Sequence, residues 1–99
     1  MREAVWPPLQ SPTMPEMTIE LAEGRTLAQK RALVENLTRA VSESIGCDPA
    51  VVTITIHEIP LEHKAKGGVL FSDRPEKVAM REEARKADLQ AWRDETTAV

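Results

Sequence analysis

The fold is decided by residues 15–59, PEMTIELAEGRTLAQKRALVENLTRAVSESIGCDPAVVTITIHEI. Apolar and polar residues alternate over 17–21, and this period of two predicts a β-strand. Residues 51–59 are β-branched at seven of nine positions, which predicts a second strand that ends before Pro60. Apolar residues spaced three and four apart predict a helix over 26–45. A strand, a helix of about twenty residues and a strand in this order indicate a crossover between parallel neighbours.

Both ends of the predicted helix carry sequence signals. Thr26 and Gln29 have the spacing of a capping box, which opens a helix by satisfying its first backbone amides. Gly46 stands where a left-handed C-terminal cap is favoured, and Pro49 prevents easy continuation. The helix should therefore end at about Ile45, with one apolar face packed on the sheet.

Beyond the second strand, the chain continues with a turn and a second helix. Residues 66–71, Lys-Gly-Gly-Val-Leu-Phe, predict a glycine turn in a short hairpin or edge element. Asp73 and Glu76 form a second capping signature around Pro75. Residues 76–95 are rich in Ala, Glu, Arg and Lys, and this composition predicts a helix.

The second predicted helix has only a narrow apolar side. Its seam consists of Met80, Ala84, Ala87 and Ala91, joined by Trp92. Glu82 and Lys86 have the four-residue spacing of a favourable ion pair. Because the seam is too weak to stabilise an isolated helix, we expect the helix to dock on another surface.

Length and composition predict one small domain that relies on partners, and the order of predicted strands and helices makes its fold class α+β. The chain has 99 residues, of which 41% are hydrophobic and only 3% aromatic. We expect an irregular N-terminal arm over 1–14, a β-α-β domain over 15–73 and a helical extension over 74–99. A domain of this size buries a limited core, which favours association with other subunits.

The charge pattern and cysteine content narrow the function classes. The formal net charge is −3, with acidic and basic residues interleaved, so we expect neither nucleic acid nor a membrane as a partner. Residues 1–8 hold an acid and two prolines where a secretory signal needs an unbroken apolar stretch. Cys47 is the only cysteine, which excludes an intrachain disulfide and fits a reducing, cytoplasmic setting.

Several features at fixed spacing follow one known pattern: Pro15, Ile19, Glu23-Gly24-Arg25-Thr26, Gln29-Lys30, the second strand and Gly67-Gly68. Together they make residues 15–71 resemble the 4-oxalocrotonate tautomerase family. The resemblance implies a β-α-β protomer that forms dimers and then a hexamer, with active sites built from more than one chain. The physical interpretation agrees, because two strands and one helix cannot cover both faces of a sheet.

The resemblance implies that Pro15 is the catalytic residue. In this family the proline is the first residue, so its nitrogen is a secondary amine that can accept a proton. Within a chain the same nitrogen is an amide with no useful basicity. Initiation at Met14 and removal of that methionine would free Pro15, and an apolar pocket would then lower the pKa of its amine. The alternative is that Pro15 merely begins a strand, where proline is tolerated.

The resemblance also implies roles for residues beyond Pro15. Arg25 matches the arginine that binds a substrate carboxylate, and the alternative is a surface arginine beside Glu23. Thr53 stands where 4-oxalocrotonate tautomerase has a second arginine, and Lys64 stands where it has a pocket phenylalanine. Lys64 could supply replacement positive charge for a carboxylate or enolate, or it could belong to a solvated basic loop. Both departures put a dicarboxylate substrate in doubt.

These residues support three functions. The first is a cofactor-free tautomerase that moves a proton in an enol or keto acid, with Pro15 as acid and base and Arg25 and Lys64 as substrate-binding residues. The second is a catalytically silent oligomeric scaffold or binding protein. The third is a hydratase or dehalogenase of an unsaturated acid, with Glu58 as a candidate for activating water.

The expected partners follow from the first function. They are a small carboxylate or enol substrate and copies of the same chain, as a hexamer or trimer of dimers. His57 and His63 lack the carboxylate arrangement of a metal site, so we expect neither a metal nor another cofactor.

Overall fold

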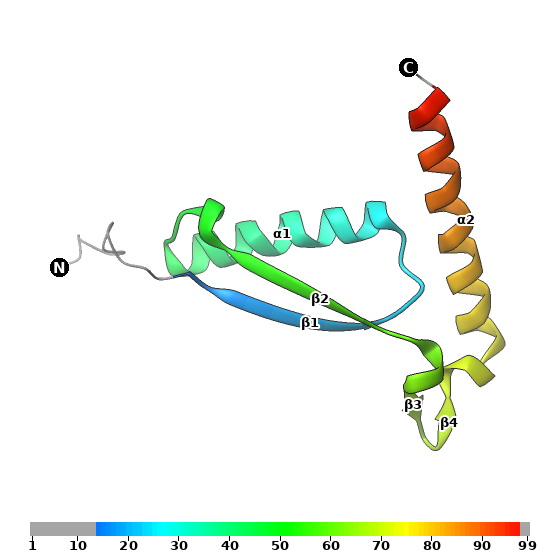
Figure 1. The fold of residues 1–99 in the computed structure, drawn as a ribbon. Coiled ribbons are helices and arrows are strands. Elements are labelled where there is room, and N and C mark those ends of the chain that lie inside the picture. The colour runs from blue at the N-terminus through cyan, green and yellow to red at the C-terminus, as the bar shows by residue number, and fades with distance from the viewer. Residues whose placement is uncertain (1–13, 98–99) are drawn as a thin grey trace.

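The computed structural model describes residues 14–97, and the predicted irregular arm lies outside this range except for residue 14. Strand β1 (Glu16–Ala22) pairs in parallel with β2 (Thr53–Ile59), and α1 (Leu27–Ile45) connects them. Figure 1 shows α1 running alongside the two strands. The predicted β-α-β crossover between parallel strands is confirmed.

The ends of α1 follow the predicted signals. The Thr26 hydroxyl oxygen accepts a hydrogen bond from the Gln29 backbone N–H at 3.0 Å, and the Gln29 side-chain oxygen accepts one from the Thr26 N–H at 2.9 Å. At the other end Gly46 has a φ of 82°, a left-handed conformation that glycine adopts without the cost of a Cβ clash. Both predicted caps are confirmed, because each depends on bonds between residues close in sequence.

The second strand begins two residues later than predicted. Residues Pro49–Val51 form a 3₁₀ turn, and the strand starts at Thr53. The Asp48 carboxylate accepts a hydrogen bond from the Ala50 N–H at 2.9 Å, and this cap favours the turn. The β-branched character of residue 51 is therefore overridden by local hydrogen bonds that a propensity count does not include.

The predicted glycine turn forms a short hairpin. Strand β3 (Ala65–Lys66) pairs antiparallel with β4 (Val69–Leu70), with Gly67 and Gly68 between them at φ of 61° and 80°. A two-residue hairpin turn of type I′ requires positive φ at both central residues, and glycine adopts positive φ freely. The hairpin lies at the base of the second helix in Figure 1.

Helix α2 (Pro75–Thr97) begins one residue earlier than predicted, and this corrects the role assigned to Asp73. The Arg74 carbonyl oxygen accepts hydrogen bonds from the backbone N–H groups of Lys77 and Val78. Asp73 instead belongs to a 3₁₀ turn over Phe71–Asp73. The residue next to the helix is therefore Arg74, because the fixed φ of Pro75 suits the first helical position.

The predicted ion pair along α2 is also wrong. Glu82 pairs with Arg85, at 3.0 Å, and Lys86 lies 3.8 Å from Glu83. Residues three apart on a helix are neighbours as well as residues four apart, so Glu82 had two possible basic partners, Arg85 and Lys86.

The buried core of the single chain is small. Among residues 14–97, the buried hydrophobic side chains are Cys47, Leu61 and Ala84. Larger apolar side chains remain exposed on α2, including Leu89 and Trp92. No helix in the described part of the chain is long and apolar enough to cross a membrane.

Candidate functional site

Pro15 directly precedes the first pair of the parallel ladder, Glu16 with Thr53. The Thr53 backbone N–H donates a hydrogen bond of 3.0 Å to the Pro15 carbonyl oxygen, and Pro15 is half-buried. Because proline has no N–H, its nitrogen takes no part in the ladder. The sheet therefore holds Pro15 through its carbonyl group, with the exposed Thr53 as its neighbour.

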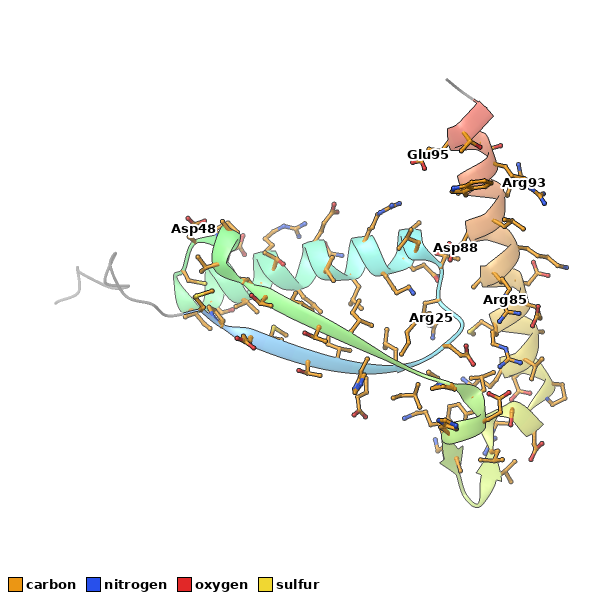
Figure 2. All side chains as sticks on the ribbon, in the orientation of Figure 1. Arg25, Asp48, Arg85, Asp88, Arg93 and Glu95 are labelled. Carbon is orange, nitrogen blue, oxygen red and sulfur yellow. The ribbon has the colours of Figure 1, made fainter. Side chains whose placement is uncertain are left out.

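Arg25 lies at the opposite end of β1, in the loop that leads into α1. Its side chain is exposed, and Figure 2 shows Arg25 at this loop and Asp88, which comes from α2, close to the start of α1. A hollow of about 260 Å³ next to Arg25 is lined by Leu21, Gln29, Lys30 and Leu33. A second, smaller hollow of about 170 Å³ is mostly charged and includes Arg25, Glu58, Arg85 and Asp88. Arg25 is thus accessible to a small anionic molecule.

A single chain does not bring Pro15 and Arg25 together. The seven residues of β1, followed by Glu23 and Gly24, lie between them, and β1 alone spans roughly 23 Å at the usual rise of about 3.3 Å per residue. A small substrate cannot bridge this distance. A site that uses both residues therefore needs them from different chains.

The loop of Arg25 is held by a polar cluster around Glu23. The Glu23 carboxylate accepts a hydrogen bond from the Leu61 N–H at 3.0 Å and one from the Arg81 guanidinium at 2.9 Å. Arg81 also bonds Glu62 at 3.3 Å. The Leu61 amide and the Arg81 charge hold the pKa of Glu23 below its ordinary value, although burial acts in the opposite direction. The cluster joins the end of β1, the segment after β2 and α2.

A second contact joins α2 to the start of α1. The Asp88 carboxylate accepts a hydrogen bond from the Leu27 backbone N–H at 2.8 Å. Such an amide at a helix N-terminus has no partner inside the helix, and a carboxylate there is favoured by the helix dipole. Gly24 lies between the two contacts, next to α2. A Cβ added to Gly24 would be 3.6 Å from the backbone nitrogen of Arg81, which is van der Waals contact. Helix α2 therefore packs directly on the loop that carries Arg25.

Lys64 lies beside an aromatic ring that the sequence analysis did not assign to the site. The Phe71 backbone N–H donates a hydrogen bond of 2.7 Å to the Lys64 carbonyl oxygen, and the Lys64 Nζ lies 5.9 Å from the centre of the Phe71 ring. Both side chains are half-buried. The glycine hairpin between them was the available signal, since a tight turn returns the chain to its starting point.

The remaining candidates lie apart from Pro15. Glu58 forms an ion pair of 2.9 Å with Lys30, beside Arg25, so its carboxylate is engaged. The His57 side chain is exposed on β2. Across the described residues, no group of three His, Cys, Asp or Glu side chains could hold a metal ion.

Comparison with known proteins matches the β-α-β part of the chain. The family model described as tautomerase enzyme matches residues 15–74. A probable tautomerase from Bradyrhizobium diazoefficiens is 46% identical over 61 residues, which cover 62% of this chain and 91% of that protein. A 2-hydroxymuconate tautomerase from Bacillus subtilis is 42% identical over 60 residues, covering 61% of this chain and 97% of that protein.

The fold is similar to that of solved tautomerases. A heterohexamer 4-oxalocrotonate tautomerase from Chloroflexus aurantiacus is 30% identical with a TM-score of 0.58, and the match covers 62% of this chain and 98% of that chain. All of α2 lies beyond the family match, which ends at residue 74. Since the family model accounts for more than half of the residues, including both strands of the ladder and α1, the chain belongs to the tautomerase family.

Proposed function

We propose that this protein is a tautomerase that moves a proton between oxygen and carbon in a small enol or keto acid. The observation that carries the proposal is the position of Pro15. It is the first residue of the family match, and its carbonyl oxygen bonds Thr53 at the start of the ladder between β1 and β2. Names of relatives, such as 2-hydroxymuconate tautomerase, support this class of reaction.

The proposed step uses the nitrogen of Pro15 as acid and base. As a free secondary amine, it accepts the proton of the enol hydroxyl while the carbonyl forms, and it then donates a proton to carbon. The proton count balances, and no electron is gained or lost. The step requires a chain that begins at Pro15, through initiation at Met14 and removal of that methionine.

Arg25 and Lys64 are the proposed substrate-binding residues. A guanidinium suits a carboxylate because its planar donors form paired hydrogen bonds, and Arg25 is exposed next to a hollow of about 260 Å³. Lys64 supplies positive charge for a carboxylate or a developing enolate, a role that Thr53 beside Pro15 cannot take.

The proposed enzyme is a homo-oligomer, as a hexamer or trimer of dimers, located in the cytoplasm. The separation of about 23 Å along β1 supports an active site shared between chains. The exposed apolar side chains Leu27 and Ile45 support burial by a partner. We retain the division into an arm over 1–14, a tautomerase domain over 15–73 and an extension over 74–99.

A catalytically silent scaffold is the second candidate. It is favoured by the absence of a cation at position 53 beside Pro15, and by the amide character of the Pro15 nitrogen in any chain that retains Met14. A hydratase or dehalogenase that uses Glu58 receives less support, because Lys30 engages that carboxylate at 2.9 Å.

The deciding experiment compares two versions of the protein, one that begins at Pro15 and one that retains all 99 residues. Ketonisation of phenylenolpyruvate and of 2-hydroxymuconate is followed by absorbance, and intact mass verifies each N-terminus. We expect turnover only in the version that begins at Pro15. Background rates in both versions would refute the tautomerase and favour the scaffold.

A further inference from the structure

Three positive charges gather around the Phe71 ring. The Lys64 Nζ, the Arg74 guanidinium carbon and the Lys77 Nζ lie 5.9, 5.6 and 5.4 Å from the ring centre. They come from three different places: the segment before the hairpin, the residue before α2 and the first turn of α2. All three side chains are half-buried, as is the ring.

These charges have no acidic counterpart in the described part of the chain. Over residues 14–97, no Asp or Glu oxygen lies within 4.0 Å of a side-chain nitrogen of Lys64, Arg74 or Lys77. Arg74 donates one hydrogen bond of 2.7 Å to the Lys66 carbonyl oxygen, and its Nε is buried without a partner. The cluster therefore has several unused donors and a net positive charge.

Attraction between the cations and the Phe71 ring does not fully offset the repulsion among the three cations. A phenyl ring has two faces, so three cations cannot each occupy a separate face, and each cation–π contact contributes only modestly by itself. The charges are at most about 12 Å apart, and because their side chains are half-buried, salt with a Debye length of about 8 Å screens their repulsion only in part. Lys77 also stands in the first turn of α2, where the helix dipole disfavours positive charge. An anion placed among the three cations would remove these costs.

We propose that Lys64, Arg74 and Lys77 bind one carboxylate group of a small organic acid, with the Phe71 ring as the apolar wall beside it. This inference rests on the proposed function, since Lys64 is one of its substrate-binding residues. It adds Arg74, Lys77 and the Phe71 ring to the substrate-binding residues. Lys77 lies outside the family match over 15–74, so the extension contributes directly to substrate selection.

Anion binding by the full-length, assembled protein tests the proposal without relying on catalysis. Isothermal titration calorimetry measures the affinity for fumarate in the original protein and in the variants Lys77→Gln and Arg74→Gln. Lys86→Gln is the matched control, because it removes the same charge from a side chain of α2 that is 75% exposed. Circular dichroism verifies that each variant keeps its helices.

We expect Lys77→Gln and Arg74→Gln each to weaken fumarate binding about tenfold, the usual effect of losing a charge-assisted hydrogen bond. Lys86→Gln should stay within about twofold of the original protein. Equal losses in Lys77→Gln and Lys86→Gln, or no fumarate binding at all, would overturn the proposal. Tighter binding of inorganic phosphate than of fumarate would overturn the assignment to a carboxylate.

Failure of the proposed function would look different. The protein could bind fumarate through Lys77 while the version that begins at Pro15 shows no ketonisation. This result would support the anion site and refute the proposed tautomerase activity. The opposite result is turnover that depends on Pro15, together with fumarate affinity that is unchanged in Lys77→Gln and Arg74→Gln. It would support the tautomerase and refute the carboxylate site at the Phe71 ring.

Discussion

The β-α-β unit and helix α2 are held in place by different interactions. The unit has a continuous parallel ladder from Glu16 to Ala22, and α1 is capped at both ends. Helix α2 instead depends on a few side-chain contacts, chiefly Arg81 with Glu23 and Asp88 with the Leu27 amide. The ladder joins backbone groups along a whole strand, and the caps are bonds between residues close in sequence, whereas single side-chain contacts between distant residues are weak separately. The unit is therefore a framework, and α2 is an attachment whose position a few residues control.

The difference extends from structure to chemistry. The family match covers the unit and stops at residue 74, and Pro15 and Arg25 both belong to the unit. Helix α2 packs on the Arg25 loop and brings Lys77 to the Phe71 ring. We infer that the unit provides the proton transfer and that α2 modifies substrate binding.

The largest expected effect follows from substituting Pro15 in a chain that begins there. Pro15→Ala should lower the rate of enol ketonisation by at least about 100-fold, because it replaces the positioned secondary amine that transfers the proton. Circular dichroism should be unchanged, since the Thr53 amide can still bond the carbonyl of residue 15. Full activity in Pro15→Ala would show that the β-α-β unit does not transfer the proton through Pro15.

Loss of Arg81 should separate the two regions. Arg81→Ala removes the bonds to Glu23 and Glu62 at once, so backbone amides of α2 should exchange hydrogen at least about tenfold faster. Amides of β1 and β2 should keep their protection. Arg85→Ala is the control, because Arg85 is 63% exposed and pairs within α2. Equal acceleration in β1 and α2 would show that the two regions open as one cooperative unit.

A smaller effect is expected when the cap of α1 is removed. Thr26→Ala should lower the free energy of unfolding by about 1 kcal/mol, because the Gln29 amide loses its acceptor. Ser44→Ala, at an exposed position of the same helix, should change it by less than about 0.5 kcal/mol. Urea unfolding at one fixed protein concentration measures both, since association affects apparent stability. Equal values for the two variants would mean that the cap does not stabilise α1.

The smallest expected effect is a pH dependence of α2 docking. The pKa of Glu23 is lowered in the folded chain, so its contribution is present above the ordinary value of 4.5 and is lost as pH falls through the lowered pKa. Trp92 and Leu27 line the same hollow between α1 and α2, and Trp92 is the only tryptophan of a chain that starts at Pro15. Its fluorescence should therefore change below about pH 4.5.

Glu23→Gln provides the matched control for this titration. It retains an oxygen that can accept the Leu61 hydrogen bond but removes the charge that faces Arg81. The fluorescence change should weaken or disappear in this variant. An identical transition in Glu23→Gln would assign the pH dependence to another carboxylate, such as Asp88.

Prediction from sequence succeeded where neighbouring residues carry the information. Thr26, Gln29 and Gly46 gave both ends of α1, and Gly67 with Gly68 gave the hairpin. It failed where two local preferences compete. Residue 51 is β-branched but belongs to a capped turn, and Glu82 pairs with Arg85 instead of Lys86. The assigned roles of Pro15, Arg25 and Lys64 stay predictions.

The sequence by itself determined the β-α-β unit, because hydrophobic periods, caps and glycine positions act within a few residues of one another. Only the tertiary structure decided that Arg81 bonds Glu23, that Asp88 bonds the Leu27 amide, and that Lys77 meets Lys64 at the Phe71 ring. Such contacts join residues far apart in the chain. They depend on the whole path of the backbone, which no local pattern of residue types specifies.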